Sequence, residues 1–295
     1  MSGVPHTVAS SDDVAVAVHE LAGDAGPDHP IVLVAHATGF HARAYLPVAA
    51  ALAPPYHVVG LDFRGHGDTA QQPDGQVEWT RYGDDAVAVA AALAGTPGGE
   101  RGLIGFGHSK GGASLLMAAH RRPELFRVLV LFEPIVFPPV DEDEPADRPS
   151  SPLAIGARRR RAVFDSVEAA IANYASKPPM QAFDPAALDA YVRYGFGPDP
   201  DGPGVRLKCE PEHEARTFDQ GGRHGTWALL PEIAVPTLVV AGAIDETQPA
   251  AVAASIAERM PNGRYRGLPH LDHFGPMTHP GEVADVVAGA VATLT

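Results

Sequence analysis

Apolar residues cluster in short runs that recur along the chain and are separated by longer, alanine-rich stretches with helical periodicity. The apolar runs lie at residues 31–35, 57–61, 102–106, 127–132 and 237–241, and the helical stretches between most of them at 43–53, 81–94 and 111–122. Strands that are apolar throughout and alternate with helices are typical of a parallel sheet covered on both faces. The pattern therefore predicts a three-layer α/β architecture.

The alternation stops after Phe132 and resumes only at Ala234, a gap of roughly a hundred residues where about 2 to 6 are usual. Within the gap, residues 166–176 and 185–196 have helical periodicity, and Asp184-Pro185 is a good cap and first-turn pair. Beyond the gap we expect a strand at 237–241, a helix at 249–260, a strand at 265–268 and a closing helix at 281–294. We therefore expect a core of residues 1–136 and 232–295 and an inserted helical lid over residues 137–231.

The charge balance changes which partners are expected. The chain has 295 residues, with 22 Lys and Arg against 36 Asp and Glu, a net charge of −14. Nucleic acid and anionic membranes would be repelled by such a surface. No apolar run approaches the roughly 20 residues that span a bilayer, and residues 1–13 do not resemble a secretory signal. We expect a cytoplasmic protein that acts on a small molecule, and the sequence leaves its oligomeric state open.

Two features of composition carry little chemistry. The single cysteine, Cys209, excludes an intrachain disulfide and a cysteine-rich zinc site. The basic block at residues 158–161 lies between acidic segments, so we interpret it as a solvated helix face or as pairing between lid and core rather than a nucleic-acid site.

The most informative motif is Gly107-His108-Ser109-Lys110-Gly111, which follows an apolar run and leads directly into a helical stretch. G-x-S-x-G in this setting is typical of a nucleophile elbow, a strand-to-helix turn that exposes a serine hydroxyl beside backbone donors. Glycines are needed on both sides because the neighbouring backbones pass too closely for a Cβ atom. The sequence therefore predicts that Ser109 is a nucleophile.

Three further segments follow predicted strands: His36-Ala37-Thr38-Gly39-Phe40, Asp62-Phe63-Arg64-Gly65-His66-Gly67 and His273-Phe274-Gly275-Pro276-Met277. Together with the elbow, and with serine first and histidine last, they resemble the α/β-hydrolase family. The resemblance implies a mostly parallel eight-stranded sheet with helices on both faces and a helical lid inserted after the sixth strand. It also implies two-step acyl transfer without a cofactor, and the serine at the elbow argues against the branches that use a carboxylate nucleophile.

The resemblance assigns the general base to His273, an imidazole suited to proton transfer near neutral pH. The acid beside it has two candidates. Asp245 follows the strand at 237–241 with the family's usual spacing and is preferred; Glu133 ends the neighbouring strand, as in the zearalenone-type lactonases that resemble this chain there. His270 could pair with His273 on a metal ion, but no third ligand is evident and we expect none.

The oxyanion hole should use the backbone N–H of Lys110 and that of Thr38, with Gly39 or Phe40 as alternatives to Thr38. We expect the Lys110 side chain to face solvent or to contact the lid. His36, His66 and His108 are interpreted as scaffold or pocket wall rather than as catalysts. Candidates to line an apolar pocket between core and lid are Phe40, Met180, Phe183, Tyr191, Tyr194 and Trp227.

These assignments predict a serine hydrolase acting on esters, lactones, thioesters or amides. A medium-sized, largely neutral ester or lactone is favoured, because the sequence around the elbow holds no cationic cluster. Two alternatives stay open. An acyltransferase of the same fold would pass the acyl group to an alcohol or amine, and a hydrolase-like binding protein would keep the pocket without turnover.

Overall fold

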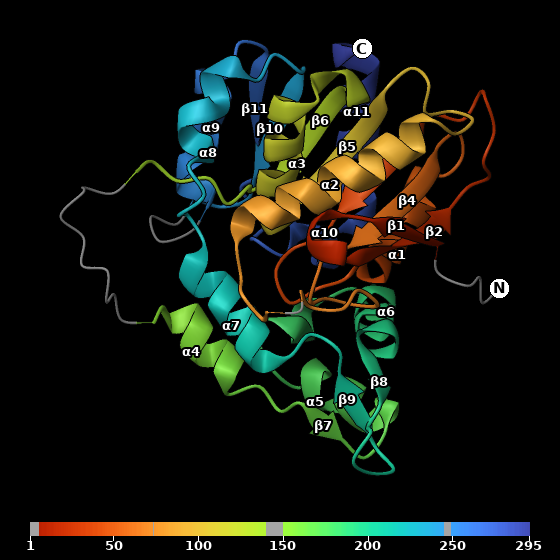
Figure 1. Cartoon of the computed structure of the whole chain (residues 1–295), viewed down its shortest axis with the longest axis vertical. Coiled ribbons are helices and arrows are strands. Elements are labelled where there is room, and N and C mark those ends of the chain that lie inside the picture. The colour runs from red at the N-terminus through yellow and green to blue at the C-terminus, as the bar shows by residue number, and fades with distance from the viewer. Residues whose placement is uncertain (1–5, 73, 140–149, 245–248) are drawn as a thin grey trace.

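The computed structural model of the chain describes residues 6–72, 74–139, 150–244 and 249–295. Within these residues, eight strands form one sheet in the order β1-β2-β4-β3-β5-β6-β10-β11 (Figure 1). The strands are β1 (His6–Ala9), β2 (Ala15–Ala22), β3 (Ile31–Ala35), β4 (His57–Asp62), β5 (Leu103–His108), β6 (Phe126–Phe132), β10 (Thr237–Ala241) and β11 (Gly263–Gly267). The six strands from β4 to β11 are parallel, and β2 is antiparallel to both of its neighbours.

Side chains of the parallel strands are buried alternately on the two faces of the sheet, which is why these strands are apolar throughout. In β3, Ile31, Leu33 and Ala35 pack with one core cluster, and Val32 and Val34 with another. The first cluster includes α2 (Trp79–Ala94), α3 (Lys110–Arg121) and α9 (Ala250–Arg259); the second includes α1 (Leu46–Leu52) and α11 (Pro280–Leu294). The predicted three-layer α/β architecture is therefore confirmed, with α2 and α3 in front of the sheet in Figure 1.

The predicted elements agree closely with the observed ones. β3 and β10 match their predicted bounds, and β4, β5, β6 and β11 differ by one or two residues at their ends. β6 and β10 are hydrogen-bonded neighbours, as expected. β1 and β2 were not predicted, because β2 carries His19 and Glu20 within its apolar run and its edge pairing is antiparallel.

The described part of the segment between β6 and β10 contains helices, as expected, and in addition three short strands. Its helices are α4 (Pro152–Arg158), α5 (Val167–Ala175), α6 (Pro185–Gly195), α7 (Pro211–Gln220) and α8 (Thr226–Leu229). Its strands β7 (Val163–Phe164), β9 (Val205–Leu207) and β8 (Phe196–Pro198) form a small antiparallel sheet. We call residues 137–231 the insertion. Most of it lies beyond one end of the large sheet (Figure 1).

Polar caps fix where three helices of the insertion begin. The side chains of Ser151 and Ser166 accept hydrogen bonds from backbone N–H groups in the first turns of α4 and α5, and Asp184 does so for α6. Shorter helices are α10 (Gly275–Thr278) and the 3-10 turns η1 (Ser11–Asp13), η2 (Ala42–Tyr45), η3 (Pro123–Leu125), η4 (Met180–Ala182) and η5 (Leu230–Glu232). Across the described ranges, no helix combines the length and the hydropathy needed to cross a membrane.

Candidate active site

Ser109 occupies the turn between β5 and α3, with backbone angles φ 56° and ψ −117°. This conformation is strained for a residue with a side chain, and strain of this kind is common at functional sites. A Cβ atom at Gly107 would lie 2.6 Å from Cα of Gly112, and one at Gly111 would lie 1.9 Å from the Ala35 carbonyl oxygen. The predicted need for glycine on both sides of Ser109 is therefore confirmed.

Glu133 is the first residue after β6 and points its carboxylate at two donors. Its Oε2 lies 2.6 Å from Nδ1 of His273, and its Oε1 accepts a hydrogen bond from the Gly242 N–H at 2.8 Å. A carboxylate only accepts hydrogen bonds, so Nδ1 of His273 carries the proton and Nε2 keeps a lone pair. Glu133 is 1% exposed, and these two bonds satisfy a carboxylate that would otherwise be costly to bury.

The preferred candidate for the acid, Asp245, lies outside the described residues. The other candidate, Glu133, contacts the imidazole of His273. It can do so because β6 and β10 are adjacent strands, as expected from the sequence. His270 is exposed and pairs with Glu282 instead of sharing a ligand with His273.

Ser109 and His273 both line a cavity of about 1040 Å³ between the core and the insertion. Three of the six pocket residues predicted from the sequence line it: Phe40, Met180 and Tyr191. Sequence reasoning missed other lining residues, including Trp79, Ile135, Phe137, Phe164 and Phe274. The aromatic and apolar walls make the cavity suitable for an organic substrate of moderate size.

The other three predicted pocket residues lie elsewhere. Phe183 is buried behind the wall and packs against the rings of Phe40 and Phe274. Tyr194 is 38% exposed under the guanidinium of Arg43, and Trp227 packs on the core beside Arg259. Aromatic residues in a predicted pocket segment cannot be separated from packing residues without knowing which helix face meets the core.

The backbone N–H groups of Thr38 and Lys110 form no hydrogen bond within the described parts of the chain. Both belong to residues that line or border the cavity, with Lys110 directly after Ser109 at the start of α3. The Phe40 N–H, an alternative donor, is used by the Ala37 carbonyl at 3.2 Å. The Gly39 N–H, the other alternative, forms no hydrogen bond among the described residues either, so Thr38 and Gly39 stay the candidates for the donor beside Lys110.

A chain of buried hydrogen bonds joins the loop after β3 to the loop that carries His273. The Ala37 N–H donates to the Tyr45 hydroxyl, which donates to Nδ1 of His108 at 2.7 Å. Nε2 of His108 donates to the His273 carbonyl at 2.8 Å. Burial lowers the pKa of His108 well below its usual value, so the ring stays neutral and keeps this pattern of donors. His108 thus belongs to the scaffold, as expected.

The side chain of Lys110 does not face solvent, so the first of the two alternatives expected for it is wrong. It is fully buried, with Nζ 3.3 Å from Nε2 of His66 and over the rings of Tyr82 (4.2 Å) and Phe63 (4.6 Å). Burial lowers the pKa of Lys110 to about 7. Lys110 is the first residue of α3, and from this position its side chain extends into the core.

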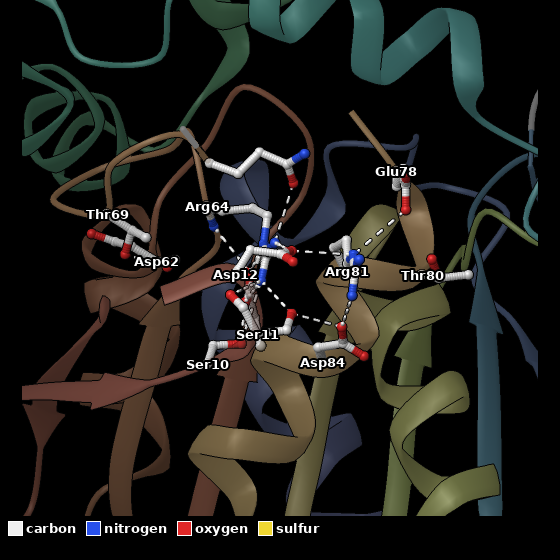
Figure 2. A network of polar contacts seen from close by, with 12 residues as sticks. Ser10, Ser11, Asp12, Asp62, Arg64, Thr69, Glu78, Thr80, Arg81 and Asp84 are labelled. Carbon is white, nitrogen blue, oxygen red and sulfur yellow. Dashed lines mark hydrogen bonds and ion pairs between the residues drawn. The ribbon is translucent and has the colours of Figure 1, made fainter. Parts of the chain in front are cut away.

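The loop after β4 is fixed by a buried ion pair. The guanidinium of Arg64, 2% exposed, contacts Asp85 of α2 at 2.7 Å and Asp12 at 2.9 Å. Figure 2 shows Arg81 approaching the same Asp12 from the outer side, together with Asp84. Because His66 lies in this loop, the network also holds one wall around the Lys110 side chain.

Arg160 ties the insertion to the loop after β3. Its guanidinium donates to Glu214 of α7 and to the hydroxyls of Tyr174 (2.9 Å) and Tyr191 (2.6 Å), and the Tyr191 hydroxyl donates to the Gly39 carbonyl at 3.1 Å. Gly39 has φ +76°, and a Cβ atom there would lie 2.2 Å from the Glu214 carboxylate. The left-handed backbone conformation explains why glycine is favoured beside Thr38.

The basic block at residues 158–161 therefore has two roles. Arg158 pairs with Glu212 and Asp219 of α7, which agrees with a structural interpretation. Arg159, Arg160 and Arg161 line the cavity, which the sequence did not predict. The available signal was four consecutive arginines at the end of a capped helix in an acidic chain.

One cluster among the described residues has the composition of a metal site. His19, Asp62 and Asp68 bring ligand atoms within 4.8 Å of one another. Asp62 already accepts hydrogen bonds from His19 and from the N–H groups of Ala42 and Asp68, and Asp68 is paired with Lys208. None of the three residues lines the cavity. Nε2 of His19 and both carboxylates are engaged in structural contacts.

Comparison with known proteins identifies the fold. The sequence profile described as the alpha/beta hydrolase family matches residues 31–286. A search of curated proteins found no match.

Solved structures extend the likeness over nearly the whole chain. E-2-(acetamidomethylene)succinate hydrolase is 21% identical, with a TM-score of 0.75 over 98% of this chain and 99% of that one. The thioesterase domain from the curacin biosynthetic pathway is 17% identical, with a TM-score of 0.74 over 97% and 100%. An esterase from Rhodococcus sp. is 18% identical, with a TM-score of 0.71 over 99% of each chain. At these identities the likeness concerns the fold.

Proposed function

Because the chain belongs to the alpha/beta hydrolase family, we propose that it is a serine hydrolase that cleaves a carboxylic ester or lactone through an acyl-enzyme. The observation that carries the proposal is the hydrogen bond between Glu133 and His273, made while His273 and Ser109 line the same cavity. Nucleophile, base and acid then come from the ends of three different core segments, and each has the chemistry that its role needs.

In the proposed mechanism, Nε2 of His273 takes the proton of the Ser109 hydroxyl as the oxygen attacks the substrate carbonyl. Glu133 holds the imidazole in the tautomer with Nδ1 protonated and stabilises the imidazolium that forms. The proton then passes to the departing alkoxide, so the alcohol leaves and an ester of Ser109 remains. Water, activated by the same imidazole, hydrolyses that ester and releases the acid.

We assign to the N–H groups of Thr38 and Lys110 the role of stabilising the negative charge that develops on the carbonyl oxygen. Support comes from their lack of other acceptors in the described chain and from the hydrogen bond of the neighbouring Ala37 N–H to Tyr45, which anchors the loop that carries Thr38. Donors that are held in place before the reaction stabilise a developing oxyanion by several kcal/mol in many enzymes, about 2.7–4 for one donor. We also propose that the insertion acts as a lid that limits access of water to the acyl-enzyme.

Two of the structural neighbours are an esterase and a thioesterase domain, and both names denote cleavage of an acyl bond. We propose that this chain catalyses a reaction of that class and that its substrate is a small molecule. The alternatives of acyl transfer to an alcohol or amine, and of binding without turnover, become outcomes of the experiment.

The test is a panel of 4-nitrophenyl esters and lactones incubated with the wild type and with Ser109→Ala, with products identified by mass spectrometry. We expect the free acid from the wild type and a loss of turnover of at least about a thousandfold in the variant. A transferred acyl group in the presence of added alcohol would identify an acyltransferase. Equal turnover by both proteins would refute the proposal.

A further inference from the structure

The cavity is lined by an excess of positive charge, although the chain as a whole is acidic. Four of the 22 lysines and arginines line it: Arg159, Arg160, Arg161 and Lys177. Of the acidic residues that the structure describes, Glu214 is the one that lines it. If charged residues were placed in the cavity wall at random, a chain with 36 acidic residues would give the wall a net negative charge. The observed positive charge therefore needs a physical explanation.

All four cations belong to the insertion. Arg159, Arg160 and Arg161 connect α4 to β7, and Lys177 follows α5. Ser109 and His273 line the same cavity from the core. A molecule in the cavity therefore meets the nucleophile on the core side and the cations on the insertion side. The sequence around the elbow holds no such cluster, which is why it predicts a neutral substrate.

Two of the four cations, Arg161 and Lys177, are held by neutral groups. Glu214 balances the charge of Arg160. The Nε of Arg161 donates to the Val163 carbonyl at 2.7 Å, and its guanidinium lies over the Phe164 ring at 4.4 Å. The Nζ of Lys177 donates to the amide oxygen of Asn173 at 2.7 Å. Carbonyl and amide acceptors orient a cation but do not neutralise it, so the positive charge stays available to a ligand.

The part of the wall near Ser109 is apolar instead. Phe40 packs against His108, the residue before Ser109, and Phe274 packs against His273; both rings line the cavity and offer no charged group to the reacting ester. A substrate that fits both parts has an apolar or uncharged segment at the scissile carbonyl and an anionic group several bonds away. An anion at the insertion would also be attracted into the cavity by the local field.

We propose that the substrate of this enzyme is an ester or lactone that carries a free carboxylate, which is bound by Arg159, Arg161 and Lys177 while the scissile carbonyl faces Ser109. The inference rests on the proposed hydrolase activity and adds the substrate class to it. In the reaction the bond from the Ser109 oxygen to the acyl carbon forms as the ester C–O bond breaks. Water then replaces Ser109, so one water is consumed and a second carboxylate is produced.

The kinetic test compares two esters of the same length. Mono-(4-nitrophenyl) glutarate carries a free carboxylate, and methyl 4-nitrophenyl glutarate has it blocked. We expect the wild type to favour the charged ester by about 10-fold or more in kcat/KM at low salt, because two or three partly solvated ion pairs contribute up to about fivefold each. Added salt should reduce this preference by screening.

The variant Arg159→Gln/Lys177→Gln should lower the ratio of the two kcat/KM values toward about one, mainly by raising KM for the charged ester. Arg193→Gln is the matched control, since Arg193 is a cation of the insertion that pairs with Asp189 and does not line the cavity. It should leave the ratio unchanged. A wild type without preference for the charged ester, or a ratio that falls equally in both variants, would overturn the proposal.

Binding without turnover separates this proposal from the hydrolase activity. Calorimetry with Ser109→Ala should detect glutarate but not 1,5-pentanediol, and Arg159→Gln/Lys177→Gln in the same background should lose the glutarate signal. If neither ester is hydrolysed but glutarate binds in this way, the anionic site stands and the proposed reaction fails. If both esters are hydrolysed equally and glutarate does not bind, the reaction stands and the anionic site is refuted.

Discussion

Glu133 lies 2.6 Å from His273, and the same carboxylate receives the Gly242 N–H on its other oxygen. One carboxylate oxygen of Glu133 therefore accepts a hydrogen bond from the imidazole, and the other accepts one from the backbone directly after β10. Glu133 reaches this position through a left-handed backbone conformation, φ 45°, immediately after β6. The Glu133 carboxylate therefore reaches the imidazole from the end of β6, the strand next to β10.

The first prediction concerns that acid. In Glu133→Gln the amide can place its oxygen toward only one of the two donors, so its NH₂ group faces either Nδ1 of His273 or the Gly242 N–H. Either arrangement disrupts the tautomer or the position of the base. We expect kcat to fall by about 100-fold to 10,000-fold with little change in KM.

Asp245→Asn is the comparison variant for this measurement, and we expect it to retain most of the wild-type kcat. Steady-state kinetics on one activated ester checks both. A larger loss in kcat from Asp245→Asn than from Glu133→Gln would return the acid role to Asp245.

The second prediction concerns the contact between the insertion and the loop after β3. Tyr191→Phe removes the hydrogen bond to the Gly39 carbonyl, one residue from the proposed oxyanion donor Thr38. We expect kcat to fall by about 10-fold while KM changes little, because the bond orients a donor that acts mainly in the transition state. Tyr174→Phe is the control: it also loses a bond to Arg160 but none to Gly39. Equal effects of the two variants on kcat would contradict this role.

The third prediction concerns pH and Lys110. Burial lowers its pKa to about 7 in the folded protein, whereas the unfolded chain keeps the amine charged to about pH 10. Between these values the unfolded state binds more protons, so raising the pH stabilises the fold, by up to about 1.4 kcal/mol per unit. The neighbouring rings of His66 and His213 stay neutral in this range, because burial lowers their pKa as well.

Lys110→Met removes this titration, so its advantage over the wild type should be largest at about pH 6 and should shrink toward about pH 9. Urea unfolding of both proteins at the two pH values measures the difference. A difference in unfolding free energy that does not change with pH would show that the lysine stays charged in the fold.

The fourth prediction concerns the network drawn in Figure 2. Arg64→Met leaves the fully buried Asp85 without its ion-pair partner, which should cost about 3–5 kcal/mol of unfolding free energy. Arg81→Met removes a 36% exposed arginine from the edge of the same network and should cost less than about 1 kcal/mol. Chemical denaturation checks the pair, and similar losses from both variants would argue against a buried, energetically important pair.

Much of the core could be predicted from the sequence, because apolar strands and helices in alternation have few ways to pack. The elbow was predictable for a related reason: Gly107 and Gly111 are dictated by backbone contacts that any residue with a Cβ atom would disrupt. In the same way, the position of Glu133 at the end of an apolar strand indicated that its carboxylate had to be paired.

The parts that were missed depend on contacts between distant segments. The sequence could not show that Glu133 turns back toward the imidazole with φ 45°, and the preferred candidate, Asp245, lies outside the described residues. The buried position of Lys110 depends on helix phase and on space left by Phe63 and Tyr82. The role of Arg160 depends on Tyr191 and Gly39, which lie far from it in sequence.

The central claim is that Ser109 forms a covalent bond with the acyl group of the substrate. Rapid quenching of the wild type during turnover of an activated ester, followed by peptide mapping by mass spectrometry, tests it directly. We predict one acyl group on the peptide that contains Ser109, absent from Ser109→Ala and retained longer in His273→Ala after labelling, because deacylation also needs the base. An acyl group on another residue, or full turnover by Ser109→Ala, would contradict the account.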